Sequence, residues 1–444
     1  MNIILNFKIF DKKKMKYKPL NSSIYKRNRL NFMDQMKGNS MAIFNSNDIY
    51  PVSADTELPF EQHRDIFHLT GIDQEETILI VYPNSKDSKT RENLFIRRSD
   101  EHTKIWEGEK LSKDLATKLS GVENVHFVED FKKILHSISN KVDTFYINKN
   151  EHYRANSPVE TREDRFINWL LKKYPAHKVA KSNPILQRLR SIKHLDEIDQ
   201  IKKACQITKK GFDRILRFVK PDVWEYQIEA EFIHEFINNS SKGFAYTPII
   251  ASGIDNNVLH YIKNNKQCKD GDLILMDVGA EYGNYSSDMT RTIPVSGSFS
   301  KRQKEVYNSV LTVKNEATKL LTIGNNWKTF HEQVGEIMTQ ELFKIGLIDK
   351  NDIKNETKKN PAYKKYFMHG TSHHLGLDTH DYGLLEDPFQ ENMVFTVEPG
   401  IYIPKEGFGI RLEDDVVIKS KGEPLNLMSD IPIIADEIED IMNS

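Results

Sequence analysis

Two pairs of acidic residues constrain the fold of this chain more than any other feature. In each pair, one acid lies before an expected turn and the other lies after it. Asp277 ends an apolar run, and Asp288 opens a second strand-like run, 289–295. The Gly-Asn pair at 283–284 predicts a turn between them. We therefore expect a β-hairpin in which Asp277 and Asp288 face each other, with Cβ atoms roughly 4.5–5.5 Å apart.

Glu398 and Glu413 form the second pair, because their midpoint falls in the turn-like segment 404–407. Like charges that oppose each other directly destabilise a sheet, and unpaired buried carboxylates are costly. Two such pairs in apolar strands are best explained by a bound cation. The sequence therefore predicts a metal site in the C-terminal half.

The segment 368–381 is rich in histidine and contains His369, His373, His374 and His380. Gly370 and Gly376 favour loop and strand over helix there, and the segment is not the H-E-x-x-H zinc signature. Four carboxylates with one imidazole suit Mn²⁺, Fe²⁺, Co²⁺ or Zn²⁺. The predicted ligand set is Asp277, Asp288, His373, Glu398 and Glu413.

Five protein ligands are too few for two separate closed sites, but they suffice for two adjacent ions that share bridging carboxylates and a water. Such a pair, about 3.5–4 Å apart, acidifies the water and stabilises a tetrahedral oxyanion. Hydrolysis of an amide is the chemistry that this arrangement predicts.

The composition indicates a globular protein with two domains, since 444 residues exceed the usual size of one core. Lys and Arg (63) nearly balance Asp and Glu (64), which argues against a nucleic-acid partner. Two cysteines indicate no disulfide framework and favour the cytoplasm. No apolar stretch approaches the roughly 20 residues that span a membrane.

The expected organisation is a leader, an N-terminal α/β domain and a catalytic domain. Residues 1–35 are rich in Lys and Asn and are expected to be poorly ordered, or translation starts at Met15. Their basic cluster follows the apolar residues, whereas in a signal peptide the basic residues come first. The α/β domain is expected over 36–182 and the catalytic domain over 190–440. In the latter, helix-helix-strands occurs twice, which suggests two similar halves.

Nine short stretches in the C-terminal half, taken in order, resemble the catalytic domain of the pita-bread metallopeptidases, and within them aminopeptidase P. They include Asp288-Met-Thr-Arg-Thr292, His369-Gly-Thr-Ser-His373, Thr396-Val-Glu-Pro-Gly400 and Gly409-Ile-Arg-Leu-Glu-Asp-Asp415. The resemblance covers roughly residues 41–436. It implies an α/β N-terminal domain followed by an α+β pita-bread domain, a curved antiparallel sheet covered by helices with a pseudo-twofold axis.

The resemblance also implies roles for the five predicted ligands. Asp277 would chelate one Mn²⁺, and His373 with Glu398 would hold the other. Asp288 and Glu413 would bridge the two ions. Glu398 would also take a proton from the bridging water and pass it to the leaving nitrogen.

Further side chains match positions that line the site in this family. His260 and His380 would stabilise substrate and oxyanion, and His369 would assist. Arg411 and Tyr402 would steady the metals and orient groups around the substrate.

Two residues of the first domain complete the resemblance. Asp55, in a segment that resembles the start of aminopeptidase P, would pair with Arg411. Trp106 resembles a tryptophan that walls the pocket of a neighbouring subunit in bacterial members; the alternative for it is a packed core tryptophan.

The activity that the resemblance implies is release of the N-terminal residue from peptides with proline second, by attack of a metal-bridging hydroxide. The cofactor would be two Mn²⁺ per chain, with Co²⁺, Fe²⁺ or Zn²⁺ as alternatives, and the enzyme a homodimer or homotetramer without nucleic-acid or membrane partners.

Four alternatives share this fold. Prolidase, which cleaves Xaa-Pro dipeptides, has the same ligands. Methionine aminopeptidase lacks the first domain, and creatinase has lost the ligands. A catalytically inactive peptide-binding module is the alternative of another class; such modules include histone-chaperone domains, but the near-neutral charge gives no sign of a histone partner.

Overall fold

The structure is a computed structural model that describes residues 16–444. The chain divides into two compact units, one of Pro19–Arg190 and the other of Ser191–Ser444 with the short stretch that ends at Lys18. This division falls eight residues after 182, the expected end of the first domain, and directly after 190, the expected start of the second. Among the described residues, no helix has the length and apolar character needed to cross a membrane.

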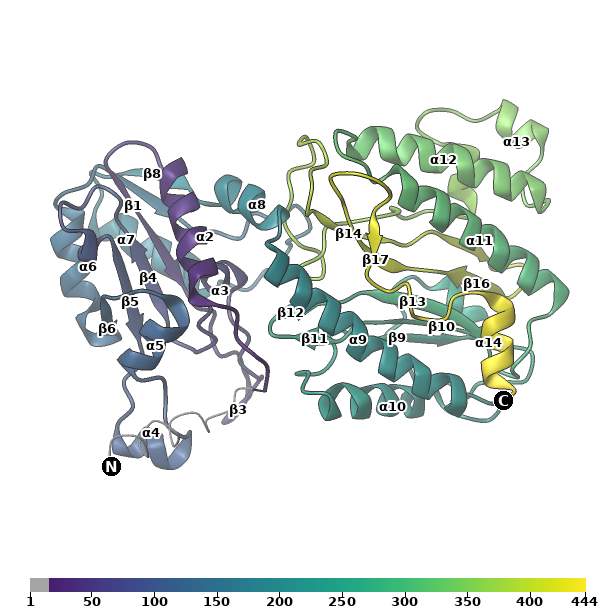
Figure 1. Ribbon diagram of the computed structural model, residues 1–444, viewed down its shortest axis with the longest axis horizontal. Coiled ribbons are helices and arrows are strands. Elements are labelled where there is room, and N and C mark those ends of the chain that lie inside the picture. The colour runs from purple at the N-terminus through teal and green to yellow at the C-terminus, as the bar shows by residue number, and fades with distance from the viewer. Residues whose placement is uncertain (1–15) are drawn as a thin grey trace. The chain divides into compact units, whose positions relative to one another are not determined.

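The first unit is built on a mixed sheet of six strands (Figure 1). In the order of their pairing, the strands are β6 (Val125–Phe127), β5 (Glu92–Ile96), β4 (Ile78–Val81), β1 (Ser40–Asn45), β7 (Thr144–Ile147) and β8 (Lys178–Lys181). β4 runs antiparallel to both β1 and β5, whereas the outer pairs are parallel. A small hairpin, β2 (Pro51–Ser53) and β3 (Thr56–Glu57), is fully exposed.

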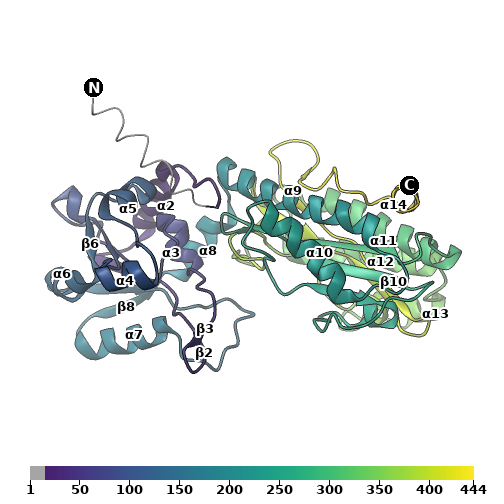
Figure 2. The same ribbon diagram turned by 90° about the horizontal axis from the view of Figure 1, so that it is seen from below.

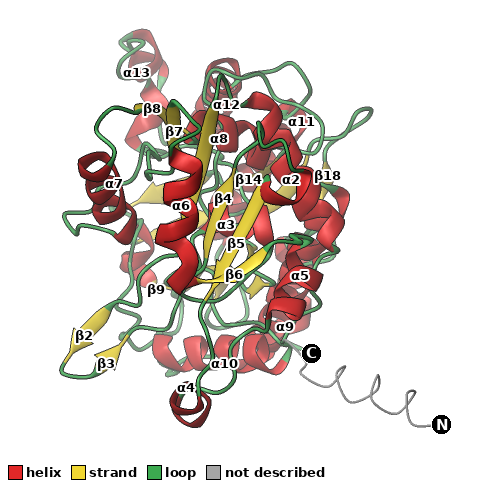
Figure 3. Ribbon diagram, turned by 90° about the vertical axis from the view of Figure 1, so that its left-hand side faces the viewer, coloured by secondary structure: helices red, strands yellow, loops and turns green. Residues whose placement is uncertain are grey.

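Helices cover both faces of this sheet, so the unit has three layers (Figure 3). Alternate strand residues face opposite sides, and each side forms its own hydrophobic cluster. One face packs against α2 (Ser22–Gln35), α3 (Arg64–Thr70), α5 (Lys113–Ser120) and α8 (Asn183–Ser191), and the other against α6 (Phe131–Ser139) and α7 (Arg162–Lys173). α4 (Glu101–Trp106) and two 3-10 turns, η2 (Ser88–Thr90) and η3 (Val128–Asp130), complete the unit.

The expectation of a poorly ordered leader is wrong for residues 22–35, which form α2. Phe32 is fully buried and its ring meets that of Phe44 edge-on at 5.3 Å. The buried guanidinium of Arg29 donates to the carbonyl oxygens of Leu69 (2.7 Å) and Ser120 (2.9 Å). Because this segment is mostly polar, its composition does not indicate the helix, although the apolar face of α2 packs in the core. Residues 1–15 of the expected leader lie outside the described residues.

The second unit repeats the order helix-helix-strands, as the sequence predicts. The first half contains α9 (Leu195–Phe218), α10 (Glu225–Asn238), β9 (Ile249–Ser252), η4 (Gly253–Asn257), β10 (Leu273–Val278), β11 (Glu281–Tyr282), β12 (Tyr285–Ser286) and β13 (Met289–Pro294). The second half contains α11 (Lys301–Leu320), α12 (Trp327–Lys344), α13 (Lys350–Lys354), η5 (Ala362–Lys365), β14 (Val394–Val397), β15 (Gly400–Ile403), β16 (Phe408–Arg411), β17 (Asp414–Val417), β18 (Leu425–Asn426) and α14 (Ala435–Met442). Figure 2 shows α9 and α10 running side by side along the strands.

The first acidic hairpin has its turn where the sequence places it, but its register differs from the expected one. Gly283 and Asn284 have φ of +61° and +69°, as a type I′ turn requires. Asp277 pairs with Thr290 rather than with Asp288. A shift of two residues keeps both carboxylates on one face as diagonal neighbours, with Cα atoms roughly 7–8 Å apart.

The second acidic hairpin has the expected register. Gly400 pairs with Arg411 in β15–β16, and Val397 pairs with Asp414 in β14–β17. The two ladders share one register, which places Glu398 opposite Glu413 in the gap between them. The prediction that these two acids oppose each other is therefore confirmed.

Replacing Phe32 with Ala should destabilise the chain by about 3–5 kcal/mol, because it empties a core position in α2. Leu30→Ala on the same helix is the matched control: Leu30 is 47% exposed, so its loss should change stability by no more than about 0.5 kcal/mol. Chemical denaturation of the full chain measures both. Equal, small effects would mean that α2 does not belong to the core.

Candidate metal centre

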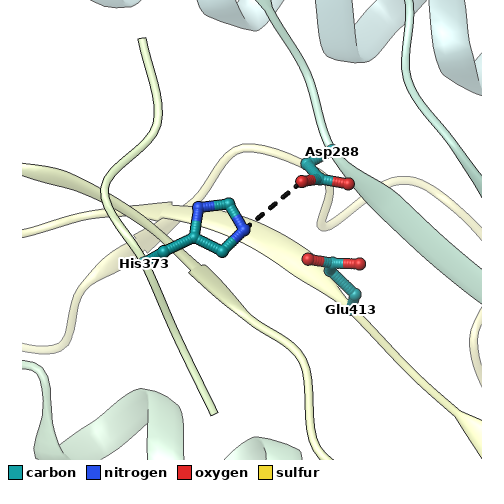
Figure 4. A group of neighbouring side chains, drawn as sticks. All are labelled: Asp288, His373 and Glu413. Atoms are coloured by element: carbon teal, nitrogen blue, oxygen red, sulfur yellow. Dashed lines mark ion pairs between the residues drawn. The ribbon is translucent and has the colours of Figure 1, made fainter. Parts of the chain in front are cut away.

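Asp288, His373 and Glu413 converge in the second unit (Figure 4), where one ligand atom of each lies within 4.8 Å of the others. Asp288 directly precedes β13 and Glu413 directly precedes β17. The Glu413 amide donates to the Thr290 carbonyl at 3.0 Å, so the two strands meet at this point. All three side chains are buried.

His373 enters from an extended segment beside β14, as the glycines of this segment predict. The Thr396 amide donates to the carbonyl oxygen of His373 at 3.0 Å. His373 Nδ1 lies 3.0 Å from the carbonyl oxygen of His374, which only accepts, so Nδ1 carries the proton. The lone pair of Nε2 is then directed at the acids, 3.5 Å from Asp288 Oδ2 and 3.7 Å from Glu398 Oε1.

Asp277 and Glu398, the other two predicted ligands, border this cluster. The hydroxyl of Tyr246 lies between two of the acids, 2.6 Å from Asp277 Oδ1 and 2.5 Å from Asp288 Oδ1. Burial, followed by the charges of Asp277 and Asp288, raises the pKa of Tyr246, so its hydroxyl stays protonated. The structure thus brings all five predicted ligands together.

The carboxyl groups are protonated more readily than isolated acids. Burial and then the charge of Asp277 raise the pKa of Asp288. Burial and then the charges of Asp288 and Glu398 raise the pKa of Glu413. Burial raises the pKa of Glu398 to about 7, against the opposing effects of His373 and Arg411.

These four acids fit a divalent metal site. Arg411, 2.6 Å from Asp277 Oδ2, pairs with one of them, whereas Asp288, Glu398 and Glu413 face one another and an imidazole lone pair. Oxygen and imidazole ligands at one point are the donors that Mn²⁺, Fe²⁺, Co²⁺ and Zn²⁺ accept. A cation at this point would favour the charged carboxylates against the burial and mutual repulsion that raise the pKa of Asp288 and Glu413.

Arg411 connects the acids through a buried network of hydrogen bonds. Its Nε donates to Thr290 Oγ1 (3.1 Å), which in turn donates to Glu413 Oε2 (2.6 Å). Its Nη1 donates to Tyr402 Oη at 2.9 Å. One guanidinium therefore fixes both hairpins, because Asp277 belongs to the first and Glu413 to the second.

His369 is engaged at both ring nitrogens. Nδ1 lies 2.7 Å from the Gly370 carbonyl and so carries the proton, which leaves Nε2 to accept from Tyr402 Oη at 2.7 Å. Burial, followed by the charge of Arg411, lowers the pKa of His369 to about 3, so the ring is neutral. It meets the centre through Tyr402 and also lies beside Glu398, with 3.9 Å between Nδ1 and Glu398 Oε2.

The remaining predicted residues lie at the edge of the metal centre or in the other unit. His380 is exposed, and its ring centroid lies 4.4 Å from that of His373. His260 is exposed on the loop after η4 and is close enough to His369 to contribute to its lowered pKa. In the first unit, Asp55 is exposed in the β2–β3 turn, and Trp106 is 75% exposed. The alternative of a core position for Trp106 is therefore wrong.

Three residues around the acids were missed from the sequence. Thr290 lies two positions after Asp288 on β13, so the period of two in a strand could have revealed it. Asp415 is buried, and its Oδ2 accepts from the backbone amide of Asp288 at 3.0 Å. Tyr246 reaches Asp277 from 31 positions earlier, and no local pattern indicates it.

Comparison with known proteins agrees with this geometry. Residues 199–420 match metallopeptidase family M24, and residues 25–146 match the aminopeptidase P N-terminal domain. The Xaa-Pro aminopeptidase of Escherichia coli (strain K12) is 32% identical over 94% of this chain and 97% of its own length. Human Xaa-Pro aminopeptidase 3 is 32% identical over 89% of this chain and 79% of its own. The structure of Zn-substituted E. coli aminopeptidase P in complex with product has a TM-score of 0.86 at 30% identity, covering 96% of this chain and 99% of that one.

Binding of Mn²⁺ to metal-free protein should release protons at pH 6. With its pKa raised to about 7, Glu398 is largely protonated there and must lose the proton to act as a ligand. Its contribution should disappear as the pH rises through 7 and above. A pH-stat titration should find about one proton fewer released by Glu398→Gln than by the wild type at pH 6. Equal release by both proteins at pH 6 would contradict the raised pKa.

Proposed function

Because the chain belongs to metallopeptidase family M24 and matches 97% of the length of the E. coli Xaa-Pro aminopeptidase, we propose that it releases the N-terminal residue from peptides with proline in the second position. The observation that carries this proposal is the acid cluster: Asp288, Glu398 and Glu413 lie at the lone pair of His373, and Tyr246 joins Asp277 to Asp288. The family implies divalent metal cofactors, and the donors present fit them.

We propose two ions, Mn²⁺ or another divalent transition metal. Asp277 would hold one and His373 with Glu398 the other, while Asp288 and Glu413 would bridge them. When bound, such a pair activates water and stabilises the negative charge that develops in amide hydrolysis. Tyr246 and Thr290 would orient Asp277, Asp288 and Glu413 toward the ions.

Glu398 is the proposed proton carrier. As a ligand beside the attacking water, its carboxylate would be placed to accept a proton from that water and return it to the leaving nitrogen. The leaving nitrogen of an Xaa-Pro bond is the tertiary nitrogen of a proline ring and carries no hydrogen. Protonation of this nitrogen is therefore required for its departure.

The histidines divide into two kinds by their contacts. His260 and His380 are exposed at the rim and would contact the substrate and the developing oxyanion. His369 is already bonded at both nitrogens, so we propose that it acts through Tyr402, which it holds against Arg411. This differs from a direct catalytic part for His369.

The alternatives fit less well. Methionine aminopeptidase lacks the N-terminal domain that this chain has. An inactive module or a creatinase-like protein would be expected to lack ligands, and all five are present. Prolidase differs in accepting dipeptides alone.

We further propose a cytoplasmic enzyme, since both cysteines are buried and free. We also propose a homodimer or homotetramer in which Trp106 forms a wall of a neighbouring subunit's pocket. Asp55 would pair with Arg411.

Cleavage of three peptide classes tests the proposal. After reconstitution with Mn²⁺, kcat/KM for Xaa-Pro-Yaa should exceed that for Xaa-Pro and for Met-Ala-Yaa by about tenfold or more, because a pocket that recognises proline and the following residue discriminates by at least that factor. Glu398→Gln should lower kcat by about 10²–10⁴-fold, whereas Glu391→Gln, at an exposed position before β14, should leave it unchanged. Faster cleavage of Xaa-Pro would favour prolidase, and no cleavage of any peptide would contradict the proposal.

A further inference from the structure

The loop between β9 and β10 carries His260, yet little burial holds it. From Asn257 to Lys263 no residue is buried, and Ile254, Val258 and Ile262 are each more than half exposed. Hydrophobic packing normally fixes a loop of this length. Apart from the packing of the Tyr261 ring, the position of His260 therefore depends on polar contacts.

Several of those contacts meet at one carboxylate, while the buried Asn264 makes others to Ile250, Pro248 and Glu229. Glu225 is the first residue of α10 and is fully buried. Its Oε1 accepts from the backbone amide of Ser252 (2.8 Å) and from the Ser252 hydroxyl (2.7 Å). Its Oε2 accepts from the Tyr261 hydroxyl (2.9 Å) and from the backbone amide of Lys266 (2.9 Å).

The four donors are spread along the whole loop. Ser252 is the residue before it, Lys266 lies at its end, and Tyr261 is the neighbour of His260 in the exposed stretch. The ring of Tyr261 also packs against the buried residues Ile249, Ala251 and Leu275. Four donors to an ionised acceptor are stronger than four neutral hydrogen bonds. Glu225 therefore ties both ends and the middle of the loop to α10 and β9.

The anchored loop lies against the strands that carry the site. Asn256, in η4, donates through Nδ2 to the carbonyl oxygens of Leu273 (3.3 Å) and Gly409 (3.2 Å). Gly409 belongs to β16, which ends at Arg411. A shift of the loop would therefore move His260 relative to Arg411 and His369.

We propose that Glu225 is a positioning residue for the peptidase reaction: its buried carboxylate holds the 253–266 loop so that His260 stays over the reacting bond. This inference rests on the proposed function. The hydrogen bonds of Glu225 go to Ser252, Tyr261 and Lys266 rather than to the acid cluster, so it acts through the loop.

Glu225→Gln keeps the size of the side chain and removes half of its acceptors. One amide oxygen can still accept from Ser252 or from Lys266, but the NH₂ group must then face the other backbone N–H. A buried donor without an acceptor is destabilising, so one end of the loop should be released. Tyr261→Phe removes the central hydrogen bond alone and leaves both ends tied.

Hydrogen exchange of the metal-loaded protein tests the anchoring without any substrate. Amides of residues 252–266 should exchange faster in Glu225→Gln than in the wild type, and those near His260 somewhat faster in Tyr261→Phe. Glu163→Gln is the matched control, because Glu163 is a buried carboxyl in the other unit; it should leave this loop unchanged. Unaltered exchange in both loop variants would overturn the proposal.

A double-mutant cycle with Ala-Pro-Ala as substrate tests the function of the anchoring. Glu225→Gln should lower kcat/KM by roughly tenfold, since small misplacements of a reacting group have effects of this size, with metal content unchanged. In a His260→Ala background the same substitution should have no further effect. If Glu225→Gln still lowers kcat/KM tenfold in the absence of His260, the role of Glu225 is only structural and the proposal is overturned.

The two proposals fail differently. Wild-type protein that does not cleave Ala-Pro-Ala contradicts the proposed function, whatever the exchange rates. Wild-type cleavage with an unchanged rate in Glu225→Gln leaves the proposed function intact and contradicts the positioning inference alone.

Discussion

Mutual repulsion among buried carboxylates is the constraint on which this structure depends. Asp288 and Glu413 are buried beside a partly buried Glu398, and burial together with the neighbouring carboxylates raises the pKa of Asp288 and Glu413. The fold nevertheless holds them together from two hairpins and an extended segment. Such an arrangement is retained when a bound cation converts the repulsion into attraction.

The surrounding residues make that arrangement rigid. Behind the acids, the buried guanidinium of Arg291 donates to the carbonyl oxygens of Thr290 (3.0 Å) and Glu413 (2.6 Å) and pairs with Asp414 at 2.7 Å. Lys314 on α11 also pairs with Asp414. Because these contacts fix the backbone beside Asp288 and Glu413, the carboxylates cannot move apart to relieve their repulsion. The same reasoning extends to the loop that carries His260, which Glu225 holds.

The sequence predicts the parts of this site that follow a local pattern. The second hairpin has the expected register, because the turn at 404–407 lies at its centre. The first is displaced by two residues, because Gly283 and Asn284 both occupy the left-handed region and Tyr282 pairs with Tyr285. The two helix pairs, α9 with α10 and α11 with α12, also stand in the predicted order before their strands. α2 was missed because its polar residues mask a buried face.

Contacts between distant segments could not be predicted in this way. Tyr246 meets Asp277 and Asp288, and Glu225 meets Tyr261, through side chains whose neighbours depend on the complete fold. The proposed residue roles are predictions that rest on geometry and on the family. The structural context does change one of them, because both nitrogens of His369 are already bonded.

The most direct test of the central claim is an anomalous difference map from crystals of the wild-type protein grown with Mn²⁺. We predict two peaks about 3.5–4 Å apart, with the carboxylates of Asp288 and Glu413 between them and His373 Nε2 bound to one. A map with no peak among these acids, or with a peak that neither Asp288 nor Glu413 contacts, would contradict the account.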